Sequence, residues 1–457
     1  MPVRHLTPHE EGIRDESVAG DRVNLRRKGA GVLLANWIVV PVHLLSGIAV
    51  IRFAGAEARG TLIILTTLVA ILATLGQFGF PTSGSYYLRQ RIYGERTLVV
   101  NYLAVVVGVT VLSGALMLTG SDLFDRVFLE GAGDTSALIL LAMCGLPMMM
   151  FSNFAAALLL AAGRVRAYSF LTVIPAVAGL AMTLMFVAVL DLGVTGALLA
   201  IVLSLGVSVL VAALPMLRRT SGQASELTRK TMGDLLRFGL RYYGVTLSFQ
   251  IFKRGDNFLL AYYLDLTAVA YYSVGVSLYE LILTLPRAVS GLVTGETAAR
   301  AKESAGEFVA RASRGVIWVM VAAALVLAPL SYLVIPPIYG EDFTEARAPA
   351  LILLASGVLF GFTLSLQSYF TGIGRPGFNA LLSFPVGALN LVLSVILIPR
   401  EGIVGNALAT LLAAAFSFAL FLFWFRRLSR TPLRSTLFPP PFALLHSVKR
   451  RLPRLKE

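Results

Sequence analysis

The 23 residues VTGALLAIVLSLGVSVLVAALPM at positions 194–216 contain no charged side chain. A helical run of about 20 apolar residues is long enough to cross the hydrocarbon core of a bilayer. Similar runs recur along the whole chain, which has 457 residues, of which 57% are hydrophobic and 14% charged, and a mean hydropathy of +0.78. The sequence therefore predicts an all-α polytopic membrane protein.

Twelve spanning helices can be placed along the chain, six in each half. They lie at residues 29–52, 60–86, 97–119, 135–162, 166–190, 194–216, 238–263, 267–293, 314–337, 346–371, 377–399 and 402–426. We expect a basic tail at 1–28, an N-lobe of helices 1–6 at 29–216, a linker at 217–237, a C-lobe of helices 7–12 at 238–426 and a second basic tail at 427–457.

The two halves repeat one another in sequence. AAGRVRAYSF at 161–170 returns as GIGRPGFNAL at 372–381, and GVTGALLA at 193–200 returns as GIVGNALA at 402–409. Because six is an even number of crossings, both halves enter the membrane from the same face. We therefore expect two six-helix lobes that are parallel repeats about a pseudo-two-fold axis along the membrane normal, a plan found among secondary transporters.

Basic residues collect on one side of this arrangement. With the N-terminus inside, 31 of the 39 Lys and Arg residues lie in inner segments and 5 in outer loops. Because positive charge marks the cytoplasmic side, we expect a multi-pass inner-membrane protein with both termini in the cytoplasm. The net charge of +14 is then explained by topology and by contact with anionic lipid headgroups, and no nucleic-acid partner is expected.

Charged and polar residues occupy the middle of the seventh and eighth predicted helices. At 100° per residue, one face of the seventh helix carries several of them, and one stripe of the eighth carries the rest. These candidate substrate-binding residues are Gln250, Lys253, Arg254, Asp256, Asn257, Ser277, Glu280, Thr284 and Arg287. Because a charge at the centre of a membrane helix costs roughly 2.5–3.5 kcal/mol on insertion scales, such residues normally face a cavity.

Two interpretations of this stripe remain open. With three cations against two acids, it can receive an anionic group inside the bilayer. Alternatively, Lys253–Asp256 and Arg254–Glu280 are structural ion pairs that hold the two helices together. In either arrangement we expect Arg287 to be the cation left without a carboxylate partner.

Other kinds of chemistry have little support in the sequence. The single cysteine and four scattered histidines give no disulfide framework and no metal-ligand spacing. There is no Gly-Lys dipeptide and hence no Walker A phosphate-binding loop, and no Ser/His/Asp set is evident. We expect no enzymatic activity, no cofactor and no metal site.

Several motifs, in order along the chain, resemble those of a transporter family. They are RFAGAEARGTL at 52–62, GFPTSGSYYLRQ at 79–90, AGR at 162–164, YSVGVSLYELILTLPRAVS at 272–290 and GIGRP at 372–376. Together they resemble the polysaccharide and oligosaccharidyl-lipid flippase branch of the multidrug/oligosaccharidyl-lipid/polysaccharide (MOP) superfamily, with O-antigen flippase-like features. One departure is that AGAEARG at 54–60 lacks the proline usual in this turn.

The resemblance implies two lobes around a central cavity that opens alternately to each side. It implies a flippase that moves polyprenyl-(pyro)phosphate-linked oligosaccharide from the inner to the outer leaflet, for cell-surface polysaccharide synthesis, with Arg254, Arg287 and Lys253 meeting the phosphates. Glycan-assembly enzymes are further candidate partners.

Three alternatives are a drug/cation antiporter of the same superfamily, a membrane glycan polymerase or ligase, and a non-transporting scaffold. The first needs a carboxylate among the N-lobe helices and the second a substantial outer loop, and neither feature is evident. The charged stripe argues against the scaffold.

Overall fold

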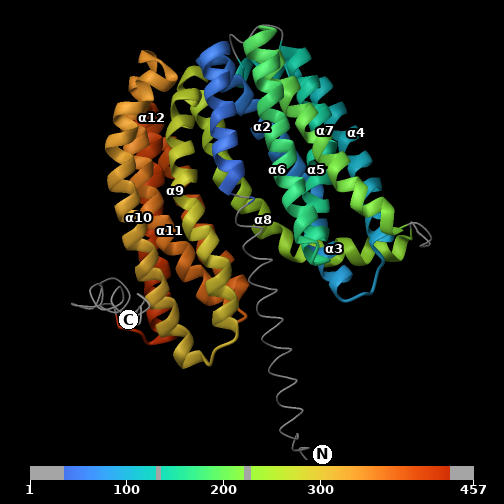
Figure 1. The fold of residues 1–457 in the computed structure, drawn as a ribbon, viewed down its shortest axis with the longest axis vertical. Coiled ribbons are helices and arrows are strands. Elements are labelled where there is room, and N and C mark those ends of the chain that lie inside the picture. Colours follow the sequence, from blue (N-terminus) through green and yellow to red (C-terminus); the bar gives the residue numbers. More distant parts are fainter. Residues whose placement is uncertain (1–34, 36, 130–134, 221–227, 433–457) are drawn as a thin grey trace, which may run out of the picture.

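The computed structural model describes residues 35, 37–129, 135–220 and 228–432, and in this part of the chain it is helical, with no strand (Figure 1). The first helix is described over Trp37–Ala54. The elements that follow are α2 (Ala56–Gln77), α3 (Phe80–Arg89), α4 (Glu95–Phe128), α5 (Thr135–Ala161), α6 (Val165–Thr183), η1 (Leu184–Val189), α7 (Gly193–Thr220), α8 (Arg229–Tyr263), α9 (Leu266–Ala298), α10 (Lys302–Tyr339), η2 (Glu341–Ala346), α11 (Arg347–Gly372) and α12 (Pro376–Ser429).

The helices account for the twelve expected crossings. Among the described residues, ten helices are long and apolar enough to cross a membrane. One of them, α12, contains a break at Gly402, where φ is +58°, so it makes two crossings, as expected for 377–399 and 402–426. The charged helix α8 supplies the remaining one. The predicted all-α polytopic fold is confirmed. The tail expected at 1–28 lies outside the described residues, and so does the part of the tail expected at 427–457 that follows residue 432. Residues 221–227 of the expected linker also lie outside them.

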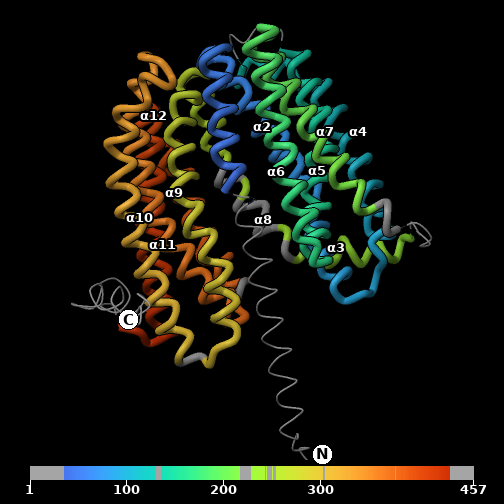
Figure 2. Tube along the Cα trace, viewed as in Figure 1, coloured from blue at the N-terminus to red at the C-terminus, as the bar shows by residue number. Residues whose placement is uncertain are grey.

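The helices form two groups that stand side by side in Figures 1 and 2. One group contains α2 to α7, which belong to the expected N-lobe, and the other contains α9 to α12, which belong to the expected C-lobe. The turns at one end of the bundle, which we call the basic end, lie at 90–94, 162–164, 299–301 and 373–375. Those at the opposite end, which we call the far end, lie at 55, 190–192, 264–265, 340 and 402.

The first helix packs against the C-lobe although it precedes the N-lobe in sequence. Its Trp37 lies beside residues of α9 and α10, and the Arg52 guanidinium donates to the carbonyls of Pro337 and Ile338 at the end of α10. Ile51 is 5% exposed, in an apolar cluster that also contains residues of α9, α10, η2 and α11. The first helix therefore lies at the interface between the lobes.

Helix α8 makes the corresponding crossing in the second half. Its 35 residues correspond to about 50 Å at 1.5 Å per residue, which is longer than a hydrocarbon core of about 30 Å. Its first turns run along α3 at the basic end (Figure 1). There Phe238 stacks on Tyr86 at 4.4 Å between ring centroids. There the Tyr93 hydroxyl donates to Asp234 at 2.6 Å, a bond that raises the pKa of Tyr93. The later part of α8 packs on α12.

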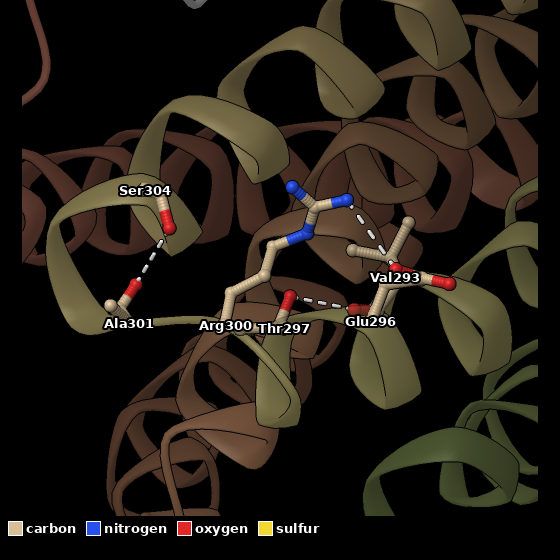
Figure 3. A network of polar contacts seen from close by, with 6 residues as sticks. All are labelled: Val293, Glu296, Thr297, Arg300, Ala301 and Ser304. Atoms are coloured by element: carbon tan, nitrogen blue, oxygen red, sulfur yellow. Dashed lines mark hydrogen bonds and ion pairs between the residues drawn. The ribbon is translucent and has the colours of Figure 1, made fainter. Parts of the chain in front are cut away.

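Two polar contacts stabilise the basic end. Arg164, in the AGR motif, makes a bidentate ion pair with Glu95, with Nη1–Oε1 at 3.0 Å and Nη2–Oε2 at 2.6 Å. At the turn between α9 and α10, Arg300 reaches back to Glu296 at 3.4 Å (Figure 3). The Arg300 guanidinium also lies over the Phe308 ring. The first pair is largely buried, and it joins the start of α4 to the start of α6.

The far end of the interface is closed by a contact that requires glycine. Gly60 of α2 lies so near the start of α9 that a Cβ at this position would be 1.9 Å from the carbonyl oxygen of Leu266. A carbonyl group at a helix start cannot move aside without disturbing the helix. The lobes therefore touch here only because position 60 has no side chain.

We predict that Gly60→Ala opens the far end of the interface. The added methyl cannot coexist with the Leu266 carbonyl, so the lobes must separate there. The probe is a cysteine that replaces the buried Ile51 in a Cys144→Ala background. In the Gly60→Ala variant this cysteine would react several-fold faster with a hydrophilic maleimide than it does when Gly60 is intact. Gly120→Ala is the matched control, because a Cβ at Gly120 meets nothing within 4 Å. Equal reactivity in the two variants would contradict the prediction.

We predict that Arg164→Ala destabilises the N-lobe by about 3 kcal/mol, since it leaves a buried Glu95 carboxylate without its partner. Arg164→Lys restores the charge but not the two parallel bonds, so its loss is smaller. Thermal unfolding in detergent measures both. The exposed Arg166→Ala is the control, and a midpoint for Arg164→Ala equal to that of this control would refute the prediction.

Candidate functional site

The polar stripe predicted from the sequence lies near the middle of α9. Its hydroxyl groups donate to backbone carbonyls of their own helix: Ser277 to Ser273 at 2.8 Å and Thr284 to Leu281 at 2.6 Å. These bonds satisfy each hydroxyl hydrogen within the helix and leave the oxygen able to accept another bond. Both residues are half-buried.

Glu280 pairs with Arg287 on the same stripe. Arg287 Nη1 donates to Glu280 Oε2 across seven residues of α9. The expectation that Arg287 has no carboxylate partner is therefore wrong. Seven residues are about two turns, and the long arginine side chain spans them by lying along the helix. The two side chains are 42% and 28% exposed, so the pair is not sealed in a dry interior.

Arg254 faces the same region from α8. The side chain is half-buried, and both Glu280 and Asp256 lie within Coulombic range of its guanidinium. Among the described residues, its buried Nε has no hydrogen-bond partner. Arg254 therefore brings positive charge and an unused N–H donor to a place with little water.

Asp256 belongs to a second, more deeply buried network. Its Oδ1 accepts from the Asn257 backbone N–H at 2.9 Å, and its carboxylate faces Asn406 and Tyr272. Asn406 is fully buried and its Oδ1 accepts from Ser394 at 2.8 Å. This network ties α8 to α9 and to both halves of α12.

Sequence reasoning missed Asn406, although a signal was present. In the internal repeat, GVTGALLA has Ala197 where GIVGNALA has Asn406. An amide that replaces alanine at a packed repeat position indicates a polar contact in the interior, and here Asn406 accepts from Ser394 and faces the Asp256 carboxylate. Tyr272 and Ser394 carry no comparable signal.

Three further candidate substrate-binding residues lie on α8, namely Gln250, Lys253 and Asn257. The Asn257 amide donates to Thr67 of α2 at 3.1 Å, so it links the two lobes rather than facing open space. Gln250 is half-buried. The side chain of Lys253 lies outside the described residues, so the expected Lys253–Asp256 pair stays a prediction.

A cavity of about 280 Å³ lies inside the C-lobe beside the stripe. Arg287 and Tyr279 of α9 line it together with Asn390 and Ser417 of α12. It offers a cation, a phenol, an amide and hydroxyls in one place. Such a set is suited to anionic or polyhydroxylated groups. Among the described residues, no cluster of three or more His, Cys, Asp or Glu side chains could hold a metal ion.

Comparison with known proteins gives a family for this chain. Residues 25–294 match the family model described as polysaccharide biosynthesis protein. An uncharacterized membrane protein of Methanocaldococcus jannaschii is 28% identical over 120 residues, which cover 24% of this chain and 22% of that protein. The chain thus aligns with about a fifth of the length of this relative.

Three solved structures have a similar fold. The lipid II flippase MurJ in an inward closed conformation aligns with a TM-score of 0.73 at 14% identity, over 89% of this chain and 88% of that chain. A MATE-family multidrug resistance transporter of the MOP superfamily aligns in its inward-facing conformation with a TM-score of 0.67 at 19% identity, over 86% of this chain and 96% of that chain. Its outward-facing conformation aligns with a TM-score of 0.62 at 18% identity, over 88% of this chain and 96% of that chain. At these identities the likeness shows the fold.

Proposed function

Because the chain belongs to the polysaccharide biosynthesis protein family, we propose that it is a flippase for polyprenyl-(pyro)phosphate-linked oligosaccharide. It would move the glycan from the inner to the outer leaflet by alternating access of the two lobes. The observation that carries the proposal is the partly exposed Glu280–Arg287 pair, which lies beside a cavity that Asn390 and Ser417 also line and within Coulombic range of Arg254.

The chemistry of the stripe suits a lipid-linked phosphate. An anionic head that reaches mid-bilayer gains most from a cationic donor that is shielded from water, as the buried Nε of Arg254 is. Arg287 can exchange its bond to Glu280 for one to the phosphate, because arginine binds carboxylate and phosphate with the same geometry. Glu280 then limits the strength of binding, so that the head can leave on the other side.

The orientation of the cycle is part of the proposal. We place the basic end and both termini in the cytoplasm and the protein in the inner membrane, following the distribution of Lys and Arg. The far-end contact at Gly60 and Leu266 then closes the outer side, so this conformation would receive substrate from the inner leaflet. We retain 29–216 and 238–426 as the two moving lobes, and glycan-assembly enzymes as candidate partners.

We predict that Arg254→Ala and Arg287→Ala each abolish most export while the protein remains inserted, because each removes charge that lowers the cost of a mid-bilayer phosphate. The measurement is the lipid-linked glycan that accumulates in the inner leaflet when cells lacking the wild-type gene carry each variant. Arg400→Ala, an exposed cation at the far end, is the matched control. Export at the wild-type level by both stripe variants would remove these residues from the mechanism.

The double variant Glu280→Gln/Arg287→Gln separates the two interpretations of the pair. If the pair is only structural, matched neutral amides preserve the packing and the export. If it binds substrate, the protein folds and export fails. Protein level on immunoblots and thermal unfolding distinguish loss of transport from loss of fold.

Drug/cation antiport is the second candidate function. The fold likeness to both conformations of the MATE transporter favours it. Cells that overproduce the protein would then gain resistance to cationic dyes. Cells depleted of the protein would accumulate no lipid-linked glycan. Accumulation without resistance favours the flippase.

A further inference from the structure

The cavity beside the stripe lies within the C-lobe, and we call it the C-lobe cavity. All of its lining residues belong to α9, α11 or α12, and its volume is about 280 Å³. The residues that give it its chemical character are Tyr279, Arg287, Phe360, Ser383, Asn390 and Ser417.

Four polar groups on this lining make no hydrogen bond to any other described residue. They are the Tyr279 phenol, the hydroxyls of Ser383 and Ser417, and the N–H₂ group of Asn390. Ser417 is only 1% exposed. A donor left without a partner inside a membrane protein is costly. The gathering of four such groups around one cavity therefore indicates a polar guest.

The charges at the cavity exclude some classes of guest. Its described lining residues include no Asp or Glu, and Arg287 brings a positive charge to one side of it. A metal ion would meet a cation and no carboxylate there, which is unfavourable. The phenol, hydroxyl and amide groups suit a neutral guest that has hydroxyls of its own, because each of them can donate a hydrogen bond.

The walls between these polar groups are apolar. Phe360 of α11 and Val386, Ala413 and Ala414 of α12 form them, together with the ring of Tyr279. A sugar ring has C–H groups on its faces and hydroxyls around its rim, so it matches such a mixed lining. Pockets for drug-sized ligands measure about 300–1,000 Å³. At about 280 Å³ the C-lobe cavity is suited to one sugar ring and not to a whole oligosaccharide.

We propose that the C-lobe cavity binds the first sugar of the glycan, the one joined directly to the phosphate of the carrier lipid. Arg287 belongs to the stripe and also lines the cavity. A phosphate held by Arg287 has its sugar only one oxygen atom away, so the sugar ring can enter the cavity. This inference rests on the proposed flippase function and adds to it a subsite that determines which first sugar is accepted.

Lipid binding to the whole protein in nanodiscs tests the inference. The probes are polyprenyl diphosphate without a sugar and the same lipid carrying a single glucose, galactose or N-acetylglucosamine. We expect the wild type to bind at least one of the single-sugar lipids about tenfold more tightly than the sugar-free lipid. Equal affinity for all four lipids would overturn the inference and leave the proposed function standing. Binding of none of them would contradict the proposed function as well.

Variants of the lining show whether a sugar preference arises in the cavity. Ser417→Ala removes one hydroxyl, and Asn390→Leu removes the amide at similar size. We expect the tenfold preference for the sugar-bearing lipid to fall to less than threefold in each. Ser208→Ala is the matched control, because Ser208 of α7 is the equivalent of Ser417 in the internal repeat and is also buried, at 6% exposed.

Thermal unfolding in detergent accompanies these measurements. If both cavity variants keep the wild-type preference, the sugar binds elsewhere and the inference fails. If they lose thermal stability and still keep the preference, the polar groups serve the fold through internal water, and the inference fails on that ground. Loss of the preference in Ser208→Ala to the same extent would also refute a subsite in the C-lobe cavity.

Discussion

A charged side chain cannot face hydrocarbon without a partner or water, and this constraint organises the centre of the molecule. Asp256, Glu280, Arg254 and Arg287 all lie within membrane helices, so α8 and α9 must turn these residues toward one another and toward the C-lobe interior. The charges separate into two sets. Asp256 is enclosed by amide and hydroxyl groups, whereas Glu280 and Arg287 remain partly exposed beside a cavity. The enclosed set around Asp256 is therefore suited to holding helices together, and the partly exposed Glu280–Arg287 pair is suited to exchange with a ligand.

The two halves of the chain are interlocked through their first helices. Trp37–Ala54 packs against α9 and α10 of the opposite lobe, and α8 runs along α3 before it reaches α12. This arrangement follows the parallel repeat, because equivalent helices of the two halves make equivalent crossings. At the far end the lobes meet at Gly60, which lies against the backbone of Leu266, and the apolar residues of α2 and α9 around this contact belong to one buried cluster.

The proposed substrate, a polyprenyl-linked sugar, joins a charged head to a long apolar tail, and α9 carries a charged stripe within the membrane. The head needs a polar route through the bilayer, whereas the tail never has to leave hydrocarbon. The hydroxyls of Ser277 and Thr284 stay available as acceptors for sugar groups along this route.

The sequence alone determined the helices, their number and the internal repeat, because apolar length and charge distribution are read directly along the chain. It also placed the polar stripe on one face of α9, since that depends only on helical periodicity. It did not determine that Glu280 pairs with Arg287, that Asn406 faces Asp256 or that the first helix packs on the C-lobe. These features depend on which helices become neighbours and on the rotamers of long side chains. Periodicity fixes the direction in which a residue points, and only the packing of the lobes fixes what it meets.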